Sequence, residues 1–417
     1  MPLNPTRNVE GENPRGNVRP KLTICFVTTY PPKPDGIATY SDELICTLKS
    51  YGHIVYVICN PDLAVGGHEG QEGVFPVMEA EKEGWHRDVF DTITMLDPDV
   101  VHLQHEYGLY DIDDQLSTDL LDLLVLLHLN AVPTVITYHS VYSTLSKKEL
   151  VFMNLSLQLV DAGIVHEELQ KIFLPVNLGW VPQNVYVIPH GAGLLRDRDR
   201  KEGVPDEAEA KRRYGLDGRD VVMCLGWWEP YKKFEDVVKI WPEVVKEASN
   251  AVLVIAGDAR PGSKNGMHYA PTLLDVIAES PARDSIMVIQ GSFSPQEYIT
   301  ILNAADVVVL PYESSTQSGV LAHAFSLGKP AVVTNVGGLV AEVAASGAGL
   351  VTVRGDLDEL RDHIVLLLKS EQMRAKYAQR AVQYVQQKIG WNYIAGMHQS
   401  IYSLVTRGRK SEASAHF

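Results

Sequence analysis

The chain has 417 residues, of which 45% are hydrophobic and 21% charged, and these values predict a globular protein with two domains rather than a single core. Its net charge of −15 argues against general binding to nucleic acid, which needs a basic surface, and gives no support to adhesion on anionic membranes. The four cysteines form no CxxC pair, so we expect buried thiols rather than disulfides or a metal site.

Residues 1–20 are polar and rich in proline, glycine and asparagine, and they lack the apolar core of a signal peptide. We expect them to form a flexible N-terminus. The most apolar stretch, residues 120–129, is interrupted by Asp122 and His128 and is too short to span a bilayer. We therefore expect a cytoplasmic protein whose contact with a membrane is at most peripheral, at its inner face.

Residues 21–195 are predicted to form the first domain, because short runs rich in valine and isoleucine alternate there with amphipathic stretches. In chain order, the expected elements are a strand at 22–28, a helix at 39–50, a strand at 54–59, a helix at 87–96, a strand at 100–104, a helix at 114–129, a strand at 134–138, a helix at 149–160, and strands at 163–166 and 185–189. Strands that are continuously apolar are covered on both faces, which predicts a parallel, doubly wound sheet.

A charged tract at 196–213 then marks an interdomain linker, which we place at 196–218. The alternation restarts in a second domain, residues 219–388. The expected elements are strands at 221–225, 251–256, 286–289, 307–310 and 331–334, and helices at 234–246, 269–279, 295–304, 356–369 and 372–388, with one more helix that opens near Gly319. Residues 389–417 are expected to form a C-terminal helix that crosses back to the first domain, and a tail.

The fold class predicted by this pattern is α/β, with two Rossmann-like, doubly wound domains that face a cleft. In such sheets, ligands bind beyond the carboxyl ends of the strands. The most informative of these ends lies in residues 310–338, where a strand, a polar loop and the helix that opens near Gly319 are followed by a second strand and a Gly-Gly turn. Free N–H groups and the positive helix end would converge there, which suits a phosphate, although an ordinary βαβ unit has the same spacing.

Polar or glycine-rich runs also follow the other predicted strands. They are TTYPPKPDGIA at 28–38, QHEYG at 104–108, YHS at 138–140, PHG at 189–191, GWWEPYKK at 226–233, GDAR at 257–260 and QGSF at 290–293. Lys232 is a candidate counter-ion for a diphosphate, because the helix dipole does not favour a lysine at a helix start. A solvated surface charge is the alternative interpretation of this residue.

Several other templates are absent. No GxGxxG follows the first strand, which argues against NAD binding in the usual mode, and no GxxxxGK[ST] occurs, which excludes a P-loop NTPase. GxSxG and HExxH are absent as well. We interpret the DxD pairs at 97/99, 111/113 and 197/199 as surface features, so the sequence requires no metal.

Taken together, several runs resemble the retaining two-domain (GT-B) glycosyltransferases, the glycosyltransferase family 4-like or group 1 enzymes. These runs are YPPKPDGIATYSDEL, DPDVVHLQHE, TYHS, VIPHG, LGWWEPYKKFED, LVIAGD and the segment 310–338. The resemblance covers nearly the whole chain after residue 20. It implies two domains that close on a UDP- or GDP-sugar, with no metal and no cofactor. It also implies that the second domain holds the nucleotide and that the first domain binds the acceptor.

The resemblance assigns roles to individual residues. His139 matches the histidine beside the reacting sugar, and Lys232 matches the lysine that neutralises the leaving diphosphate, so these two are the implied catalytic residues. Gly36 matches the first-domain glycine near the diphosphate. Gly319 and Val320 would offer backbone N–H groups to the same diphosphate.

The remaining assignments come from the same resemblance. Implied contacts to the donor sugar are Ser315, Thr316, Gln317 and Ser318, those to the ribose and base are His323, Gln290 and Ser292, and those on the acceptor side are His105 and Glu106. Three positions depart from the family pattern. Ser315 and His323 stand where the family usually has glutamates, and Trp227 stands where it often has an arginine. These departures leave the donor sugar and the nucleotide open.

The leading interpretation is a hexosyltransferase that acts on a saccharide or a lipid-linked saccharide and makes a precursor of a polysaccharide or glycolipid. Within the same fold, a phosphorylase or a disaccharide synthase is a rival. A nucleotide-sugar epimerase and a non-catalytic nucleotide-sugar binding protein are further alternatives. The presence of Lys232 and His139 argues against the last of these.

Overall fold

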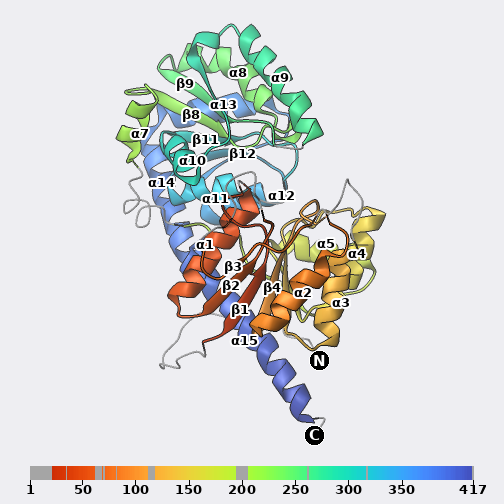
Figure 1. Ribbon diagram of the computed structural model, residues 1–417. Coiled ribbons are helices and arrows are strands. Elements are labelled where there is room, and N and C mark those ends of the chain that lie inside the picture. Colours follow the sequence, from red (N-terminus) through yellow and green to blue (C-terminus); the bar gives the residue numbers. More distant parts are fainter. Residues whose placement is uncertain are drawn as a thin grey trace, which may run out of the picture.

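The computed structural model describes residues 21–33, 35–61, 68, 71–80, 82–110, 118–193, 205–260, 263–315 and 318–415. These residues form two α/β domains, one above the other in Figure 1, and each domain is built on a parallel sheet flanked by helices. The predicted fold class is confirmed.

The first domain contains a seven-stranded sheet in the order β3-β2-β1-β4-β5-β6-β7. Its strands are β1 (Thr23–Val27), β2 (Ile54–Ile58), β3 (Val74–Phe75), β4 (Val100–His105), β5 (Thr134–Tyr138), β6 (Ala162–Val165) and β7 (Val185–Val187), and its helices are α1 (Gly36–Ser50), α2 (Trp85–Leu96), α3 (Asp119–Leu129), α4 (Lys147–Leu159) and α5 (Glu168–Leu178). Alternate residues of β1 enter different cores, because successive side chains of a strand point to opposite faces. Ile24 and Phe26 pack with α1 and the C-terminal helix, whereas Cys25 and Val27 pack with α2, α3 and α4.

The second domain contains a six-stranded sheet in the order β10-β9-β8-β11-β12-β13. Its strands are β8 (Asp220–Leu225), β9 (Ala251–Gly257), β10 (Ile286–Gln290), β11 (Val307–Leu310), β12 (Ala331–Thr334) and β13 (Gly349–Thr352). Its longer helices are α7 (Glu207–Arg213), α8 (Phe234–Glu247), α9 (Lys264–Glu279), α10 (Pro295–Asn303), α11 (Gly319–Ser326), α12 (Gly337–Ser346), α13 (Leu357–Lys369) and α14 (Glu371–Tyr384). All residues of β8, β9, β11 and β12 are buried, except the first residue of β8. This burial on both faces explains why the four strands have continuous apolar sequences.

Both sheets reverse their strand order at one place. In the first domain the reversal lies between β1 and β4, and in the second it lies between β8 and β11. Chains leaving neighbouring strands at such a point diverge to opposite faces, which opens a crevice at the carboxyl ends. The predicted segments after β1, β4, β8 and β11 therefore lie at the two crevices where ligands are expected.

The chain passes between the domains near residue 192 and again near residue 390, and these two segments lie side by side. The N–H of Ala192 donates to the carbonyl of Ile389 at 2.8 Å, and a Cβ placed on Gly191 would lie 2.4 Å from the ring of Trp391. Trp391 begins α15 (Trp391–Ala415), which packs on α1 and runs down the first domain in Figure 1. Gly191 is needed here because no larger residue fits beside the indole.

The structure differs from the predicted elements in a few places. It adds β3, α5, α12 and β13, and the predicted Gly-Gly turn at 337–338 is instead the first turn of α12. The predicted linker contains α7, which is tied to the second domain by an ion pair of 2.7 Å between Lys211 Nζ and Asp306 Oδ2. Helix α1 begins three residues early because the Asp35 carboxylate caps it by accepting from the Ala38 N–H.

Candidate active site

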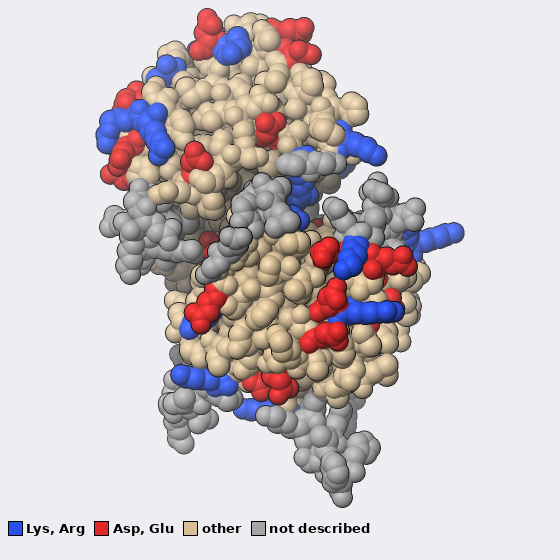
Figure 2. Space-filling view, viewed as in Figure 1, with Lys and Arg blue, Asp and Glu red and all other residues tan. Residues whose placement is uncertain are grey.

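A cleft of about 2280 Å³ lies between the two domains. From the first domain its lining includes Gly36, Tyr40, Glu106, His139, Glu167 and His190, and from the second it includes Trp227, Lys232, Arg260, Ser292, Ser315, Gly319, Val320 and His323. The strand-end segments of both crevices thus open into one space. The face of the protein seen in Figure 2 carries Lys and Arg interspersed with Asp and Glu.

Helix α1 of the first domain and helix α11 of the second domain both begin at this cleft. Helix α1 begins at Gly36, and a Cβ placed on Gly36 would meet nothing within 4 Å. Helix α11 begins at Gly319 after Ser318, whose hydroxyl accepts from the Leu321 N–H. The first N–H groups of a helix lack intrahelical partners and carry partial positive charge, so the start of α11 can receive an anion. At the start of α1, the Asp35 carboxylate already accepts from the Ala38 N–H.

Lys232 brings a full positive charge into the same space. Its side chain is buried, and its Nζ lies 5.2 Å from the centroid of the Tyr312 ring. A Cβ placed on Gly226 would lie only 2.7 Å from Nζ, so the glycine makes room for the ammonium group. Burial lowers the pKa of Lys232 to about 8; the charge of Arg260 acts in the same direction and that of Glu229 opposes it.

His139 lines the first-domain side of the cleft. Its Nε2 lies 2.8 Å from Gln104 Oε1, and its Nδ1 lies 3.3 Å from Nε2 of His166. Burial lowers the pKa of His139 well below its usual value, and neighbouring histidines add to the effect, so the ring is neutral at physiological pH. Because both ring nitrogens already have partners, a substrate hydroxyl would have to replace one of them.

The two residues predicted on the acceptor side are placed differently. Glu106 lines the cleft, and its Oε2 accepts from the Ser140 hydroxyl at 2.6 Å. Burial raises the pKa of the Glu106 carboxyl. His105 instead lies among the aromatic side chains behind the sheet, stacked on Phe152 with ring centroids 4.3 Å apart, and it is not among the described residues that line the cleft.

The predicted contacts to the sugar, ribose and base are partly brought together. Ser292, Ser315 and His323 line the cleft, and His323 Nδ1 lies 3.3 Å from the Tyr298 hydroxyl. Burial lowers the pKa of His323 to about 4. Gln290 is exposed and donates to Asp258 at 3.2 Å, outside the lining. Thr316 and Gln317 lie outside the described residues.

Several polar residues that face the cleft were given no role by the sequence analysis. His190 and Arg260 lie in the runs at 189–191 and 257–260 that follow predicted strands, whereas Tyr40 and Glu167 were not singled out. Tyr40 packs edge-on against His139 and His166, and burial raises the pKa of the Glu167 carboxyl to about 7. Position was the available signal, because Glu167, His190 and Arg260 lie within three residues of a strand end and Tyr40 lies in the second turn of α1.

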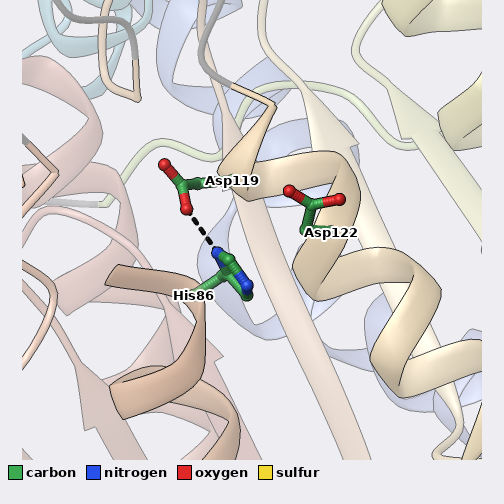
Figure 3. Close-up of side chains that lie close together, drawn as sticks. All are labelled: His86, Asp119 and Asp122. Carbon is green, nitrogen blue, oxygen red and sulfur yellow. Dashed lines mark hydrogen bonds and ion pairs between the residues drawn. The ribbon is translucent and has the colours of Figure 1, made fainter. Parts of the chain in front are cut away.

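A second cluster of titratable side chains lies away from the cleft, where α2 meets α3. His86, Asp119 and Asp122 place one ligand atom each within 4.8 Å of one another. Figure 3 shows His86 of α2 hydrogen-bonded to Asp119, the first residue of α3. Asp122 lies beside them, one turn further along α3. Asp119 also accepts from the Gly84 N–H at 2.9 Å. These hydrogen bonds account for the arrangement, so we assign the cluster a structural role.

Replacing Asp119 by alanine is expected to lower the free energy of unfolding by about 1–3 kcal/mol, because the Gly84 N–H and the His86 ring lose their acceptor. Asp122→Ala is the matched control, since Asp122 is exposed on the same helix and should change stability little. Urea denaturation of both variants measures the difference. Equal stability of the two variants would contradict the structural role of Asp119.

Comparison with known proteins finds a family match in the second domain and a fold match over nearly the whole chain. The sequence model of the family described as "Glycosyl transferases group 1" matches residues 206–384. The fold matches the crystal structure of Anabaena Alr3699/HepE in complex with UDP-glucose, with a TM-score of 0.72 and 18% identity, over 93% of this chain and 100% of that one. Residues 206–384, in the second domain, match the group 1 glycosyltransferases, and the chain as a whole has the GT-B fold. The family predicted from the sequence is confirmed.

Curated relatives of this chain agree with these matches. The chain is 24% identical over 207 residues to N-acetyl-alpha-D-glucosaminyl L-malate synthase of Bacillus anthracis. The aligned region covers 49% of this chain and 51% of the relative. The chain is 22% identical over 328 residues to alpha-monoglucosyldiacylglycerol synthase of Streptococcus pneumoniae, which covers 74% and 69%. Apart from the latter, the chain spans about half the length or less of the curated relatives shown by the comparison. Within the described part of the chain, no helix is both long and apolar enough to cross a membrane.

Proposed function

We propose that the protein transfers a hexose from a UDP- or GDP-sugar to a saccharide or lipid-linked saccharide, with retention of configuration and without a metal. The observation that carries the proposal is the convergence of the Lys232 ammonium group and the start of α11 on one cleft between the domains. The family and the UDP-glucose named for the Anabaena structure support a nucleotide-sugar donor.

The bond that breaks joins the anomeric carbon of the donor to a diphosphate oxygen. Negative charge grows on the diphosphate as this bond lengthens, and fixed positive charge lowers the energy of that state. Lys232 supplies a full charge, while the N–H groups of Gly319 and Val320 supply oriented dipoles from the same side. A cation and a helix start of this kind can take the part that a divalent metal plays in other transferases.

The acceptor would approach from the first domain. Glu106 and Ser140 form a hydrogen-bonded pair on that wall, and His139 directly follows β5 and precedes Ser140. Holding the acceptor hydroxyl against the anomeric carbon removes the entropic cost of their encounter. For retention, the hydroxyl must attack from the face that the diphosphate leaves, where a departing phosphate oxygen can accept its proton.

A panel of UDP- and GDP-hexoses, each offered with soluble sugars and with lipid-linked saccharides, tests this function. Release of nucleoside diphosphate that depends on an acceptor, with a product of unchanged anomeric configuration by NMR, is expected. A sugar epimerised without any acceptor would instead support the epimerase alternative. Absence of nucleoside diphosphate release with every donor would contradict the proposal.

The pH dependence of kcat/KM should reveal the charge on Lys232. The ammonium form exists below its pKa of about 8 and is lost as pH rises through that value, so kcat/KM should fall on the alkaline side of about pH 8. Lys232→Arg is the control, because a guanidinium group stays protonated throughout this range. Its alkaline limb should vanish even where its overall rate is lower. An unchanged limb in Lys232→Arg would assign the titration to another group.

A further inference from the structure

The loop after β9 brings another cation, Arg260, to the cleft that contains Lys232. Arg260 is exposed and lines the cleft, and its guanidinium group makes no hydrogen bond or ion pair with any residue that the structure describes. A guanidinium group can bind two phosphate oxygens with parallel N–H bonds. An arginine that lines a cleft without an ion-pair partner is therefore available for an anionic ligand.

This loop is bonded to the loop that carries Trp227. The Trp228 N–H donates to the Asp258 carbonyl at 2.7 Å, and the Gly226 N–H donates to the Ala256 carbonyl at 3.0 Å. A Cβ placed on Gly257 would lie only 2.0 Å from the Gly226 carbonyl oxygen, which shows how closely the two backbones approach. Arg260 thus projects from the strand end adjacent to Trp227, the position where related enzymes often have an arginine.

Arg260 also acts on Lys232. Its positive charge is one of the causes that lower the pKa of Lys232, and across the cleft it acts on Glu106. Two cations that face one space repel each other, and an anion between them relieves the repulsion. A diphosphate carries enough negative charge to satisfy both groups, whereas a neutral sugar would leave the repulsion in place.

We propose that Arg260 is a second ligand of the donor's diphosphate and replaces the arginine that is missing at Trp227. The inference rests on the proposed function and adds a residue to it. It predicts that the diphosphate is held between Lys232 on the loop after β8 and Arg260 on the loop after β9. It also explains how a chain with tryptophan at position 227 can keep two cations beside the leaving group.

Isothermal titration of UDP, GDP and the matching monophosphates into wild type and Arg260→Ala tests this inference. Arg260→Ala should weaken binding of the preferred nucleoside diphosphate on the order of tenfold or more, since a charge-assisted phosphate contact is lost. The monophosphate should lose less, so that the ratio between the two affinities shrinks. Trp227→Arg combined with Arg260→Ala should recover part of the lost affinity, and Lys246→Ala, a change of the same charge on an exposed part of α8, should bind as wild type does.

Each outcome separates the two proposals. Wild type that binds no nucleoside diphosphate overturns the proposed function and the role of Arg260 together. Wild type that binds one, with Arg260→Ala binding it equally well, overturns only the role of Arg260. Equal losses for diphosphate and monophosphate would also overturn that role, because they would indicate a general structural effect.

Discussion

Lys232→Met is expected to lower turnover by about two to three orders of magnitude while the domain stays folded, as removal of a main electrostatic contact to the leaving group does in other enzymes. Methionine keeps the apolar stem and the buried volume beside Tyr312 but removes the charge. Turnover of the best donor from the nucleotide-sugar panel, measured at saturating acceptor, gives the loss. The melting temperature of the variant shows whether the fold survives, and the removal of a buried charge should raise it or leave it unchanged.

Lys233→Met is the matched control for this prediction. Lys233 is the next residue in the chain, but its Nζ pairs with Glu313 at 3.1 Å and the residue is not among those that line the cleft. We expect its turnover to stay within a few-fold of wild type. Equal losses in both variants would show that general charge, rather than the Lys232 position, matters. Full activity of Lys232→Met would remove Lys232 from the site.

Gly257→Ala is expected to be the most destabilising small substitution near the cleft. Its φ of 141° lies in a region that residues with a Cβ rarely adopt, and the new Cβ would lie 2.0 Å from the Gly226 carbonyl oxygen. Backbone strain and overpacking each cost roughly 1–3 kcal/mol, so the free energy of unfolding should fall by about 2–6 kcal/mol. Because β8 and β9 would separate there, the Lys232 and Arg260 loops would shift as well.

Gly218→Ala serves as the control for strain alone. Gly218 also has a positive φ, of 66°, but a Cβ placed there would meet nothing within 4 Å. Its loss should stay near about 1 kcal/mol. Urea denaturation of both variants gives the comparison. If Gly257→Ala were no less stable than Gly218→Ala, the close approach of the two strand ends would be wrong.

The sheets could be predicted because their strands are buried on both faces and therefore read as continuous apolar runs. Strand β5 has the predicted bounds, and β8 and β11 differ from them by at most one residue. Several elements with weaker local signals were not predicted. Strand β3 has only two residues, α5 contains Pro175, and α12 opens with two glycines. The local sequence of these three elements therefore gives no clear signal for a strand or a helix.

The sequence could predict only those site residues that lie close to the end of a predicted strand or the start of a predicted helix. Lys232, Gly319 and His139 were placed at strand ends by the sequence pattern, and the structure brings them to one cleft. Arg260 follows a strand end too, but its proximity to Lys232 depends on two loops from neighbouring strands. His105 shows the reverse case, because it ends β4 but its side chain points into the aromatic core behind the sheet.

The position of a bound nucleotide tests the account most directly. A crystal structure with UDP or GDP, whichever the protein binds more tightly, should show the diphosphate beside Lys232 Nζ and the N–H groups of Gly319 and Val320, with the base toward Ser292. Electron density for the diphosphate on the first domain alone, or away from both Lys232 and the start of α11, would contradict the account.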